Sequence, residues 1–279
     1  MKKRPIIAFL YDFDYTLCQA NMQDFGLVPT LGLTPNEFWG KADKFAKATG
    51  CERILSYMWV IIDECKRKHI KCDQKWFARL GKPIQYFPGV LDWFKRINTY
   101  AKKQGVEVEH YIISSGNKEI VEGSVVAKEF KEIYACEFCF DPKTKLPTWP
   151  KLVINYTQKT QFFYRISKGV TNVHDDVNIN KHVGTPRIDH RNIVYIGDGL
   201  TDVPAMTVVK NSGGRSIAVY SHHKKDTVIA LMKEGRVNYA CKADYRENKE
   251  LDKVAKLIID NIAITEKLAH RQNKEKKKL

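Results

Sequence analysis

The chain has 279 residues, of which 43% are hydrophobic, so it can bury the core of one or two domains, and wholesale disorder is excluded. No apolar run reaches the ~18 residues of a membrane-spanning helix. Seven cysteines, an odd number, favour a reducing compartment over a disulfide framework. The net charge of +15, from 47 basic and 32 acidic residues, fits phosphate-bearing partners, nucleic acid included, or a lysine-rich solvated surface.

The first segment begins with Lys-Lys-Arg ahead of an apolar stretch, as a secretory signal does. The stretch from Ile6 to Tyr11 is too short for the core of a signal, and Asp12 follows it without a small-residue cleavage site. We therefore expect a buried parallel strand here and a cytoplasmic protein without a membrane segment.

Residues 20–85 carry helix signals and no strand signal. The sequence TPNE at residues 34–37 is a capping box with proline at the first helical position, and it opens a helix that Gly50 ends. Two more helices are expected at residues 52–69 and 73–80. We predict that residues 20–85 form a helical cap.

From Pro88 onward, apolar strands alternate with amphipathic helices, which predicts a doubly wound parallel α/β sheet, a Rossmann-like core with the cap inserted. The expected strands are residues 5–11, 106–113, a strand and turn at 133–150 with a return at 152–155, 193–196 and 216–220. The expected helices are residues 88–105, 117–130, 158–167, one near Pro204, 225–233 and 249–270. The core then comprises residues 1–19 and 86–270, with an irregular excursion at 169–190 and a basic flexible tail at 271–279.

Three of the expected strands end in polar clusters, DFD at residues 12–14, SSGN at 114–117 and GDGLTD at 197–202. Ligands bind beyond the carboxyl ends of strands in an open parallel sheet. Each cluster by itself is most often a turn or a helix cap. If the strands are neighbours, however, four aspartates meet, and a cation must offset their repulsion. Oxygen ligands of this kind favour Mg²⁺.

Taken together, the clusters resemble the motifs of the haloacid dehalogenase superfamily. DFDYTL matches its first motif, IISSG its second and YIGDGLTD its fourth, while Lys159 stands where the family carries its third-motif lysine. The resemblance covers residues 5–245. The long gap between Asp12 and Ser114 looks like the phosphoserine-phosphatase-like branch, which inserts a helical cap there.

This resemblance implies a phosphatase, a phosphoric monoester hydrolase that uses Mg²⁺ and an aspartyl-phosphate intermediate. Asp12 would attack phosphorus, and Asp14 would protonate the leaving oxygen and then activate water. The implied metal-binding residues are Asp12, Asp14 through its backbone carbonyl, Asp198 and Asp202. The implied phosphate-binding residues are Thr16, which fixes the loop, Ser114, Ser115, Gly116 and Lys159.

Some assignments have competitors. Lys168 competes with Lys159 for the third-motif role, and Ser115 replaces Ser114 if the strand ends one residue later. Tyr15 occupies a position where small residues are common in the family. Cys136 and Cys139 form a CxxC without a second ligand pair, so we interpret them as ordinary buried or half-buried thiols.

A cap that closes over the leaving group implies a small phosphorylated metabolite as the substrate. The residues of the cap that could select it are Asn21, Gln23, Lys44, Arg53, Phe25, Trp39 and Trp59, although packing or solvent exposure is the more frequent role for each. The alternatives are a basic nucleic-acid-binding protein on the same fold and a phosphatase that acts on nucleic-acid ends. Neither is favoured, because no nucleic-acid-binding motif is visible.

Overall fold

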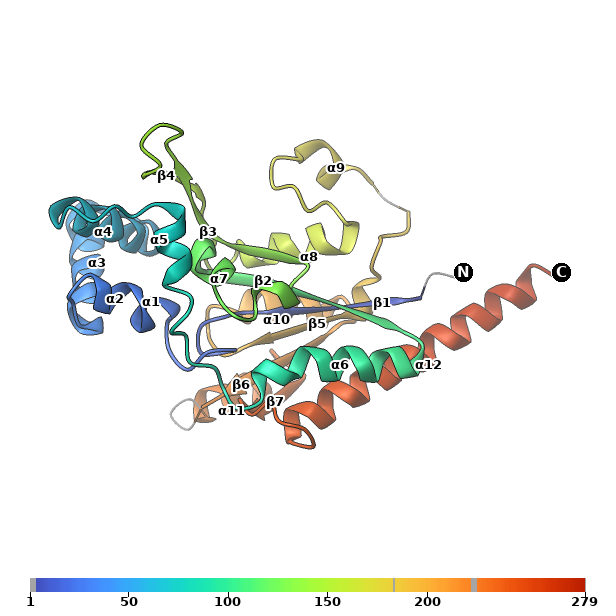
Figure 1. The fold of residues 1–279 in the computed structure, drawn as a ribbon. Helices are drawn as coiled ribbons and strands as arrows, with labels where there is room; N and C mark the ends of the chain where they lie inside the picture. Colours follow the sequence, from blue (N-terminus) through green and yellow to red (C-terminus); the bar gives the residue numbers. More distant parts are fainter. Residues whose placement is uncertain (1–3, 183, 222–224, 279) are drawn as a thin grey trace.

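The computed structural model describes residues 4–182, 184–221 and 225–278. Its strands form one sheet in the order β4-β3-β2-β1-β5-β6-β7 (Figure 1). Neighbouring strands are parallel except for the antiparallel pair of β3 and β4. The strands are β1 (Ile6–Tyr11), β2 (Glu107–Asn117), β3 (Glu132–Phe140), β4 (Pro147–Leu152), β5 (Ile193–Gly197), β6 (Arg215–Tyr220) and β7 (Tyr239–Lys242).

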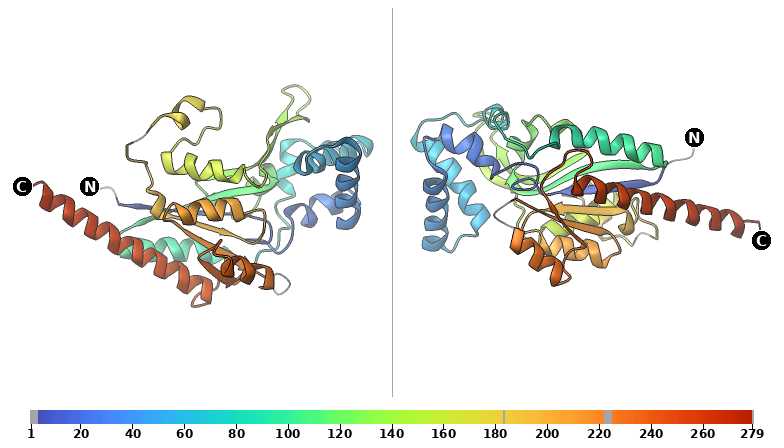
Figure 2. Two further views of the ribbon diagram at one scale, coloured as in Figure 1. Left: turned by 180° about the vertical axis from the view of Figure 1, so that it is seen from behind. Right: turned by 90° about the horizontal axis from the view of Figure 1, so that it is seen from below.

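Helices cover both faces of this sheet, as the views in Figures 1 and 2 show. Helices α6 and α12 lie side by side on one face, and α8 and α10 lie against each other on the opposite face. The prediction of a doubly wound α/β fold is therefore confirmed. The helices of this core are α6 (Val90–Gln104), α7 (Lys118–Glu122), α8 (Lys159–Lys168), α9 (Asp176–Asn180), α10 (Val203–Asn211), α11 (Lys225–Lys233) and α12 (Glu250–Lys276), with short 3-10 turns η1 (Ala127–Glu129) and η2 (His190–Asn192).

Five helices fall within residues 20–85 and lie together beyond the carboxyl end of β1 (Figure 1). The predicted capping box is present, since the Glu37 amide donates to Thr34 Oγ1 and the Thr34 amide donates to the Glu37 carboxylate. Gly50, with a φ of 72°, ends this helix as expected. The five helices are α1 (Met22–Phe25), α2 (Leu27–Thr30), α3 (Pro35–Thr49), α4 (Arg53–Arg67) and α5 (Gln74–Arg79).

The interior beneath α6 contains a buried polar chain. The Trp93 indole N–H donates to the Tyr11 hydroxyl over 2.9 Å, so the Tyr11 O–H is left to donate to His110 Nδ1 at 3.0 Å. His110 Nε2 then donates to Asn98 Oδ1, also at 3.0 Å. Burial lowers the pKa of His110 to about 3, so the ring is neutral inside the fold.

Two element predictions need correction around the second motif. The helix expected at residues 117–130 ends at Glu122, and the next residue, Gly123, passes so close to α5 that a Cβ there would lie 1.8 Å from the Ala78 carbonyl oxygen. The returning strand is β4, Pro147–Leu152, rather than residues 152–155. Its prolines are tolerated because β4 is the edge strand of the sheet.

Three further differences lie in the second half of the chain. The excursion at residues 169–190 contains the short helix α9 and is not wholly irregular. Strand β7 was not predicted. The last helix continues to Lys276, so most of the predicted flexible tail at 271–279 is helical, with an ion pair of 3.1 Å between Arg271 and Glu275 one turn apart. Within the described residues, none of the helices combines the length and apolar character needed to cross a membrane.

Candidate active site

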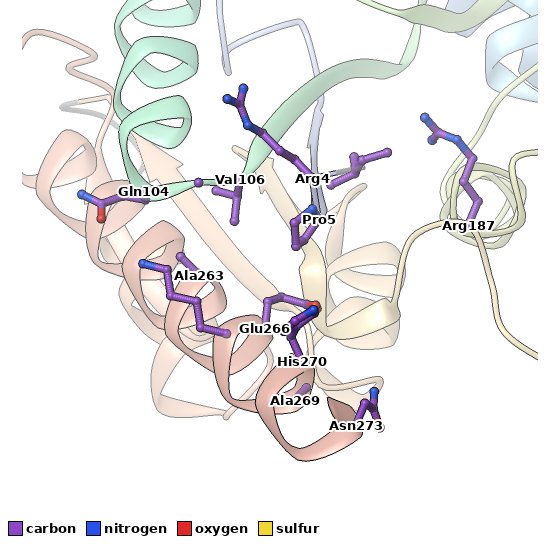
Figure 3. Close-up of a pocket in the computed structure, with 13 residues that line it drawn as sticks. Arg4, Pro5, Gln104, Val106, Arg187, Ala263, Glu266, Ala269, His270 and Asn273 are labelled. Carbon is purple, nitrogen blue, oxygen red and sulfur yellow. The ribbon is translucent and has the colours of Figure 1, made fainter. Parts of the chain in front are cut away.

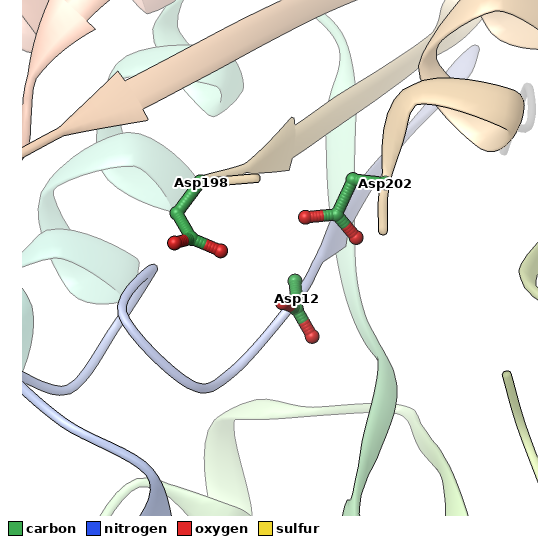
Figure 4. Close-up of side chains that lie close together, drawn as sticks. All are labelled: Asp12, Asp198 and Asp202. Atoms are coloured by element: carbon green, nitrogen blue, oxygen red, sulfur yellow. The ribbon is translucent and has the colours of Figure 1, made fainter. Parts of the chain in front are cut away.

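Three carboxylates meet beyond the ends of the neighbouring strands β1 and β5 (Figure 4). Asp12 directly follows β1, Asp198 directly follows β5, and Asp202 directly precedes α10. One oxygen of each lies within 4.8 Å of the others. All three side chains are buried. The structure thus brings together three of the four aspartates that the sequence singled out.

Lys159 supplies the positive charge of this cluster. It is the first residue of α8 and is 1% exposed, and its Nζ lies 2.9 Å from Asp12 Oδ1 and 2.7 Å from Asp202 Oδ1. Burial alone would lower its pKa, but the attraction of the two carboxylates raises that pKa overall, so the amine stays protonated. The competitor Lys168 instead donates to the carbonyls of Ile179 and Lys181 in the excursion.

Among the described ion pairs, the buried Lys159 amine is shared by two of these carboxylates, Asp12 and Asp202. Burial raises the pKa of Asp12 well above its usual value, and Asp202 raises it further, while Lys159 lowers it. A buried site that presents several carboxylate oxygens suits a divalent cation that prefers oxygen ligands, such as Mg²⁺.

The residues present therefore fit a metal, but they do not contribute alike. Asp12 and Asp198 offer carboxylate oxygens directly. Asp202 Oδ1 accepts hydrogen bonds from Lys159 and from the Tyr195 hydroxyl at 2.8 Å, and Oδ2 accepts a longer one from the Gly199 amide at 3.4 Å, so Asp202 suits a supporting role beside a metal or a metal-bound water. The side chain of Asp14 lies outside the three-carboxylate group, and its predicted metal contact through the backbone carbonyl stays a prediction.

Asp14 occupies the side of the site next to the cap. Its Oδ1 accepts a hydrogen bond of 2.8 Å from the Met22 amide at the start of α1. Burial raises the pKa of Asp14 to about 7, although the Met22 hydrogen bond lowers it in part. A carboxyl group with such a pKa can hold or accept a proton near neutral pH, as a general acid and base must. Between Asp14 and Thr16, Tyr15 has a φ of 55°, so the loop turns tightly there.

The second motif forms the irregular end of β2. This strand continues to Asn117 with a shift in register after Ile113, so both predicted serines lie inside it, and the choice between them stays open. Ser114 is fully buried, and its Oγ accepts from the Gly116 amide at 3.0 Å. That amide, predicted to bind phosphate, therefore already has an acceptor. Thr16 Oγ1 is buried and has no hydrogen-bond partner among the residues that the structure describes, while the Thr16 carbonyl accepts from Tyr245.

The seven candidate residues of the cap lie in different surroundings. Asn21 and Trp39 both donate to the carboxylate of Asp24, and Gln23 is buried against the core. Trp59 and Lys44, by contrast, line a groove between α3 and α4 to which no catalytic candidate contributes. Of the remaining two, Arg53 is paired with Asp43 on the surface, and Phe25 is half-buried against the core cluster.

The CxxC thiols lie in β3, where Cys136 is buried and Cys139 is half-buried. Both are free, as predicted. A groove of about 740 Å³ lies at the opposite end of the sheet, between the start of β1 and the exposed half of α12 (Figure 3). None of the predicted site residues lines it.

Sequence reasoning missed two tyrosines that contact the site. Tyr195 lies in β5 and holds Asp202, and Tyr57 lies in α4 and donates to the Ser115 carbonyl at 2.7 Å. The alternation of side chains along a strand could have indicated Tyr195, because it stands two residues before Gly197. No local signal marks Tyr57, which is one of several apolar residues in its helix.

No protein-family model matches the chain. An uncharacterized protein of Borreliella burgdorferi is 26% identical over 277 residues, which span 90% of this chain and 95% of that protein.

Three solved structures share the fold. A HAD family hydrolase of Salmonella enterica serovar Typhi has a TM-score of 0.57 at 14% identity, over 91% of this chain and 72% of the other. A probable phosphoserine phosphatase of Vibrio cholerae has a TM-score of 0.58 at 11% identity, over 94% and 67%. A substrate-bound phosphoserine phosphatase has a TM-score of 0.51 at 16% identity, over 92% and 99%. The chain therefore has the fold of the haloacid dehalogenase superfamily hydrolases, in the phosphoserine-phosphatase-like form that its motifs resemble.

Proposed function

We propose that this protein is a Mg²⁺-dependent phosphatase that hydrolyses a small phosphomonoester through a phosphorylated Asp12. The observation that carries the proposal is the buried cluster of Asp12, Asp198, Asp202 and Lys159 with Asp14 beside it. Like charges at this density are costly to bury and are typical of catalytic sites. The phosphatase names of the structural neighbours agree with this reading.

In the first half of the reaction, a carboxylate oxygen of Asp12 attacks phosphorus, and the bond from phosphorus to the leaving alcohol breaks. Lys159, 2.9 Å from Asp12, favours the ionised form of the carboxylate and attracts the phosphoryl group. Ser114 and the orphaned hydroxyl of Thr16 are the neutral groups available to the phosphoryl oxygens and the loop that holds them.

Asp14 transfers the proton in both halves of the reaction. In its protonated form it donates to the leaving alkoxide, and in its ionised form it takes a proton from the water that hydrolyses the aspartyl-phosphate. The Met22 amide holds one oxygen of Asp14 and leaves the other for this exchange. When bound by Asp12 and Asp198, Mg²⁺ would offset the charge of the phosphoryl group and its attacking oxygen.

The cap favours a small substrate over the end of a nucleic acid. Asp12 is 5% exposed, and the cap contacts the second motif directly through Tyr57 and Gln23. A polymer end would have to displace these buried contacts, whereas a metabolite can be enclosed by them. The net charge of +15 remains compatible with a polyanion elsewhere on the surface.

Phosphate release from a panel of phosphorylated metabolites, with Mg²⁺ and with a chelator, tests the proposal. We expect release that requires the metal, and a brief reaction stopped with acid should leave one phosphoryl group on the peptide that contains Asp12. Release that is equal with the chelator, or label on another residue, would contradict the mechanism. Absence of release from every compound would contradict the function.

A further inference from the structure

The cap touches the catalytic machinery at the second motif. Gln23 Nε2 donates to Asn117 Oδ1 at 3.1 Å, with both side chains buried. The Met22 side chain sits against Gly116, where a Cβ would lie 2.1 Å from Met22 Cε. The cap is thus seated directly on residues 114–117, and a larger residue at position 116 would displace the Met22 side chain.

Tyr57 makes the third of these contacts from the middle of α4. Its side chain is buried, at 3% exposure, and its hydroxyl donates to the Ser115 carbonyl over 2.7 Å. The Trp39 ring packs edge-on against the Tyr57 ring at 5.7 Å. Burial raises the pKa of Tyr57, so the hydroxyl remains a donor. The other group near this carbonyl is the Cys136 thiol at 3.4 Å, which is a weak donor.

The Ser115 carbonyl and the Gly116 amide belong to the same peptide group. That group is trans, and planarity makes its C=O and N–H point in opposite directions. Fixing the carbonyl toward Tyr57 therefore fixes the N–H away from the cap, where it donates to Ser114 Oγ at 3.0 Å. Because this bond occupies a lone pair of Ser114 Oγ, it also orients the Ser114 hydroxyl.

Regular sheet bonding does not hold this peptide in place. The register between β2 and β3 shifts between Ile113 and Asn117, so the ladder is interrupted across the segment. The orientation of the peptide then depends on the side chains around it, and Tyr57 provides the strongest of the contacts to its carbonyl.

We propose that Tyr57 is a positioning residue that links the seating of the cap to the geometry of the phosphate-binding segment 114–117, through the chain Tyr57 hydroxyl, Ser115–Gly116 peptide and Ser114 hydroxyl. The proposal rests on the proposed phosphatase function for its catalytic consequence. Its structural part, control of one peptide by a cap side chain, does not. Tyr57 orients Ser114 when the cap is seated and releases it when the cap moves.

Tyr57→Phe removes the hydroxyl and keeps the ring that packs on Trp39, so the variant should fold. We expect kcat to fall by about two- to tenfold, the range of one neutral hydrogen bond, with KM changed by less than about twofold. The matched control is Tyr100→Phe, which loses a hydroxyl bonded to Asp260 on the α6–α12 face, and we expect it to leave kcat unchanged.

Hydrogen exchange of the Gly116 amide, measured on the full chain without substrate, gives a second readout that needs no activity. We expect exchange to be about tenfold faster in Tyr57→Phe and unchanged in Tyr100→Phe. Unchanged exchange in Tyr57→Phe would overturn the proposal whatever happens to kcat, and so would faster exchange with unchanged kcat in an active enzyme. Faster exchange in a protein with no phosphatase activity would support the link to the cap and overturn the proposed function alone.

Discussion

The two ends of the sheet differ in their openness and in the balance of their charges. At the carboxyl end, three buried carboxylates lie close together beside the cap, and Lys159 pairs with two of them, Asp12 and Asp202. At the amino end, a groove of about 740 Å³ stands open beside α12, with Arg4, Lys267 and His270 among its lining residues (Figure 3).

We do not expect catalysis in the groove at the amino end of the sheet. Exposed basic side chains are stabilised by water and need no partner, whereas buried carboxylates at close range cost free energy that only a ligand or a reaction explains. A cluster of buried carboxylates is therefore a better guide to the candidate active site than the size of a cavity. The predictions below test this contrast.

The largest expected effect is at the buried end. Asp12→Asn should lower kcat by more than about a hundredfold, because an amide cannot form the acyl-phosphate. The fold should persist, since the substitution removes a charge that burial disfavours. The matched control is Asp92→Asn on the exposed face of α6, which should keep full activity. Activity of Asp12→Asn above about one hundredth of the wild-type value would exclude Asp12 as the nucleophile.

Asp14→Asn should cause a loss that depends on the leaving group. For an alkyl phosphate, whose alkoxide needs a proton, we expect the phosphorylation step to slow by roughly a hundredfold. For an activated aryl phosphate, which leaves without a proton, the loss should be smaller. Single-turnover kinetics on both substrates measures this difference, and equal losses would remove Asp14 from the acid role.

A buried group outside the site should influence stability and not catalysis. His110 has its pKa lowered to about 3, so the unfolded chain binds more protons than the fold below the ordinary histidine pKa of about 6.5. Stability from this residue is complete above that pH and is lost as the pH falls toward the folded pKa. The loss should be about 2 kcal/mol between about pH 8 and about pH 5.

Urea unfolding at both pH values measures this effect. His110→Gln should flatten the pH dependence by about that amount, although its own stability will be lower, because the chain to Tyr11 and Asn98 is altered. His174→Gln, at an exposed position, is the control for the substitution itself. An unchanged slope in His110→Gln would show that burial does not lower the pKa of this ring in the fold.

The sequence predicted where the candidate site residues lie in the sheet, because the signals for their positions are local. An apolar strand followed at once by an aspartate placed Asp12 and Asp198, and the start of a helix distinguished Lys159 from Lys168. The contacts of the cap could not be predicted in this way. Tyr57 meets Ser115 across 58 positions of the chain, and only the packing of α4 on the core decides which of its side chains points there.

The misplaced elements have a similar cause. Strand β4 contains Pro147 and Pro150, which argue against a strand until its place at the edge of the sheet is known. The last helix ends in residues that look like a solvated tail, yet lysine, arginine, glutamine and glutamate are good helix formers, and the packed first half of α12 nucleates them.

The smallest effect is expected at the open end, from removal of residues 271–279. This deletion takes away five basic residues and Glu275, so the net charge falls by four, from +15 to +11. Residues 271–276 lie on the projecting, exposed end of α12, beyond the amino end of the sheet (Figure 1), and salt screens exposed charges beyond about 8–10 Å. For a small phosphomonoester, kcat/KM should therefore change by less than about threefold at physiological ionic strength.

If the protein instead bound nucleic acid through this end, the deletion would weaken binding and flatten its dependence on salt, because each lost phosphate contact reduces that slope. Both quantities can be measured on the full and shortened chains. Salt-sensitive nucleic-acid binding that disappears with the deletion, in a protein without metabolite phosphatase activity, would reverse the contrast and place the function at the open end.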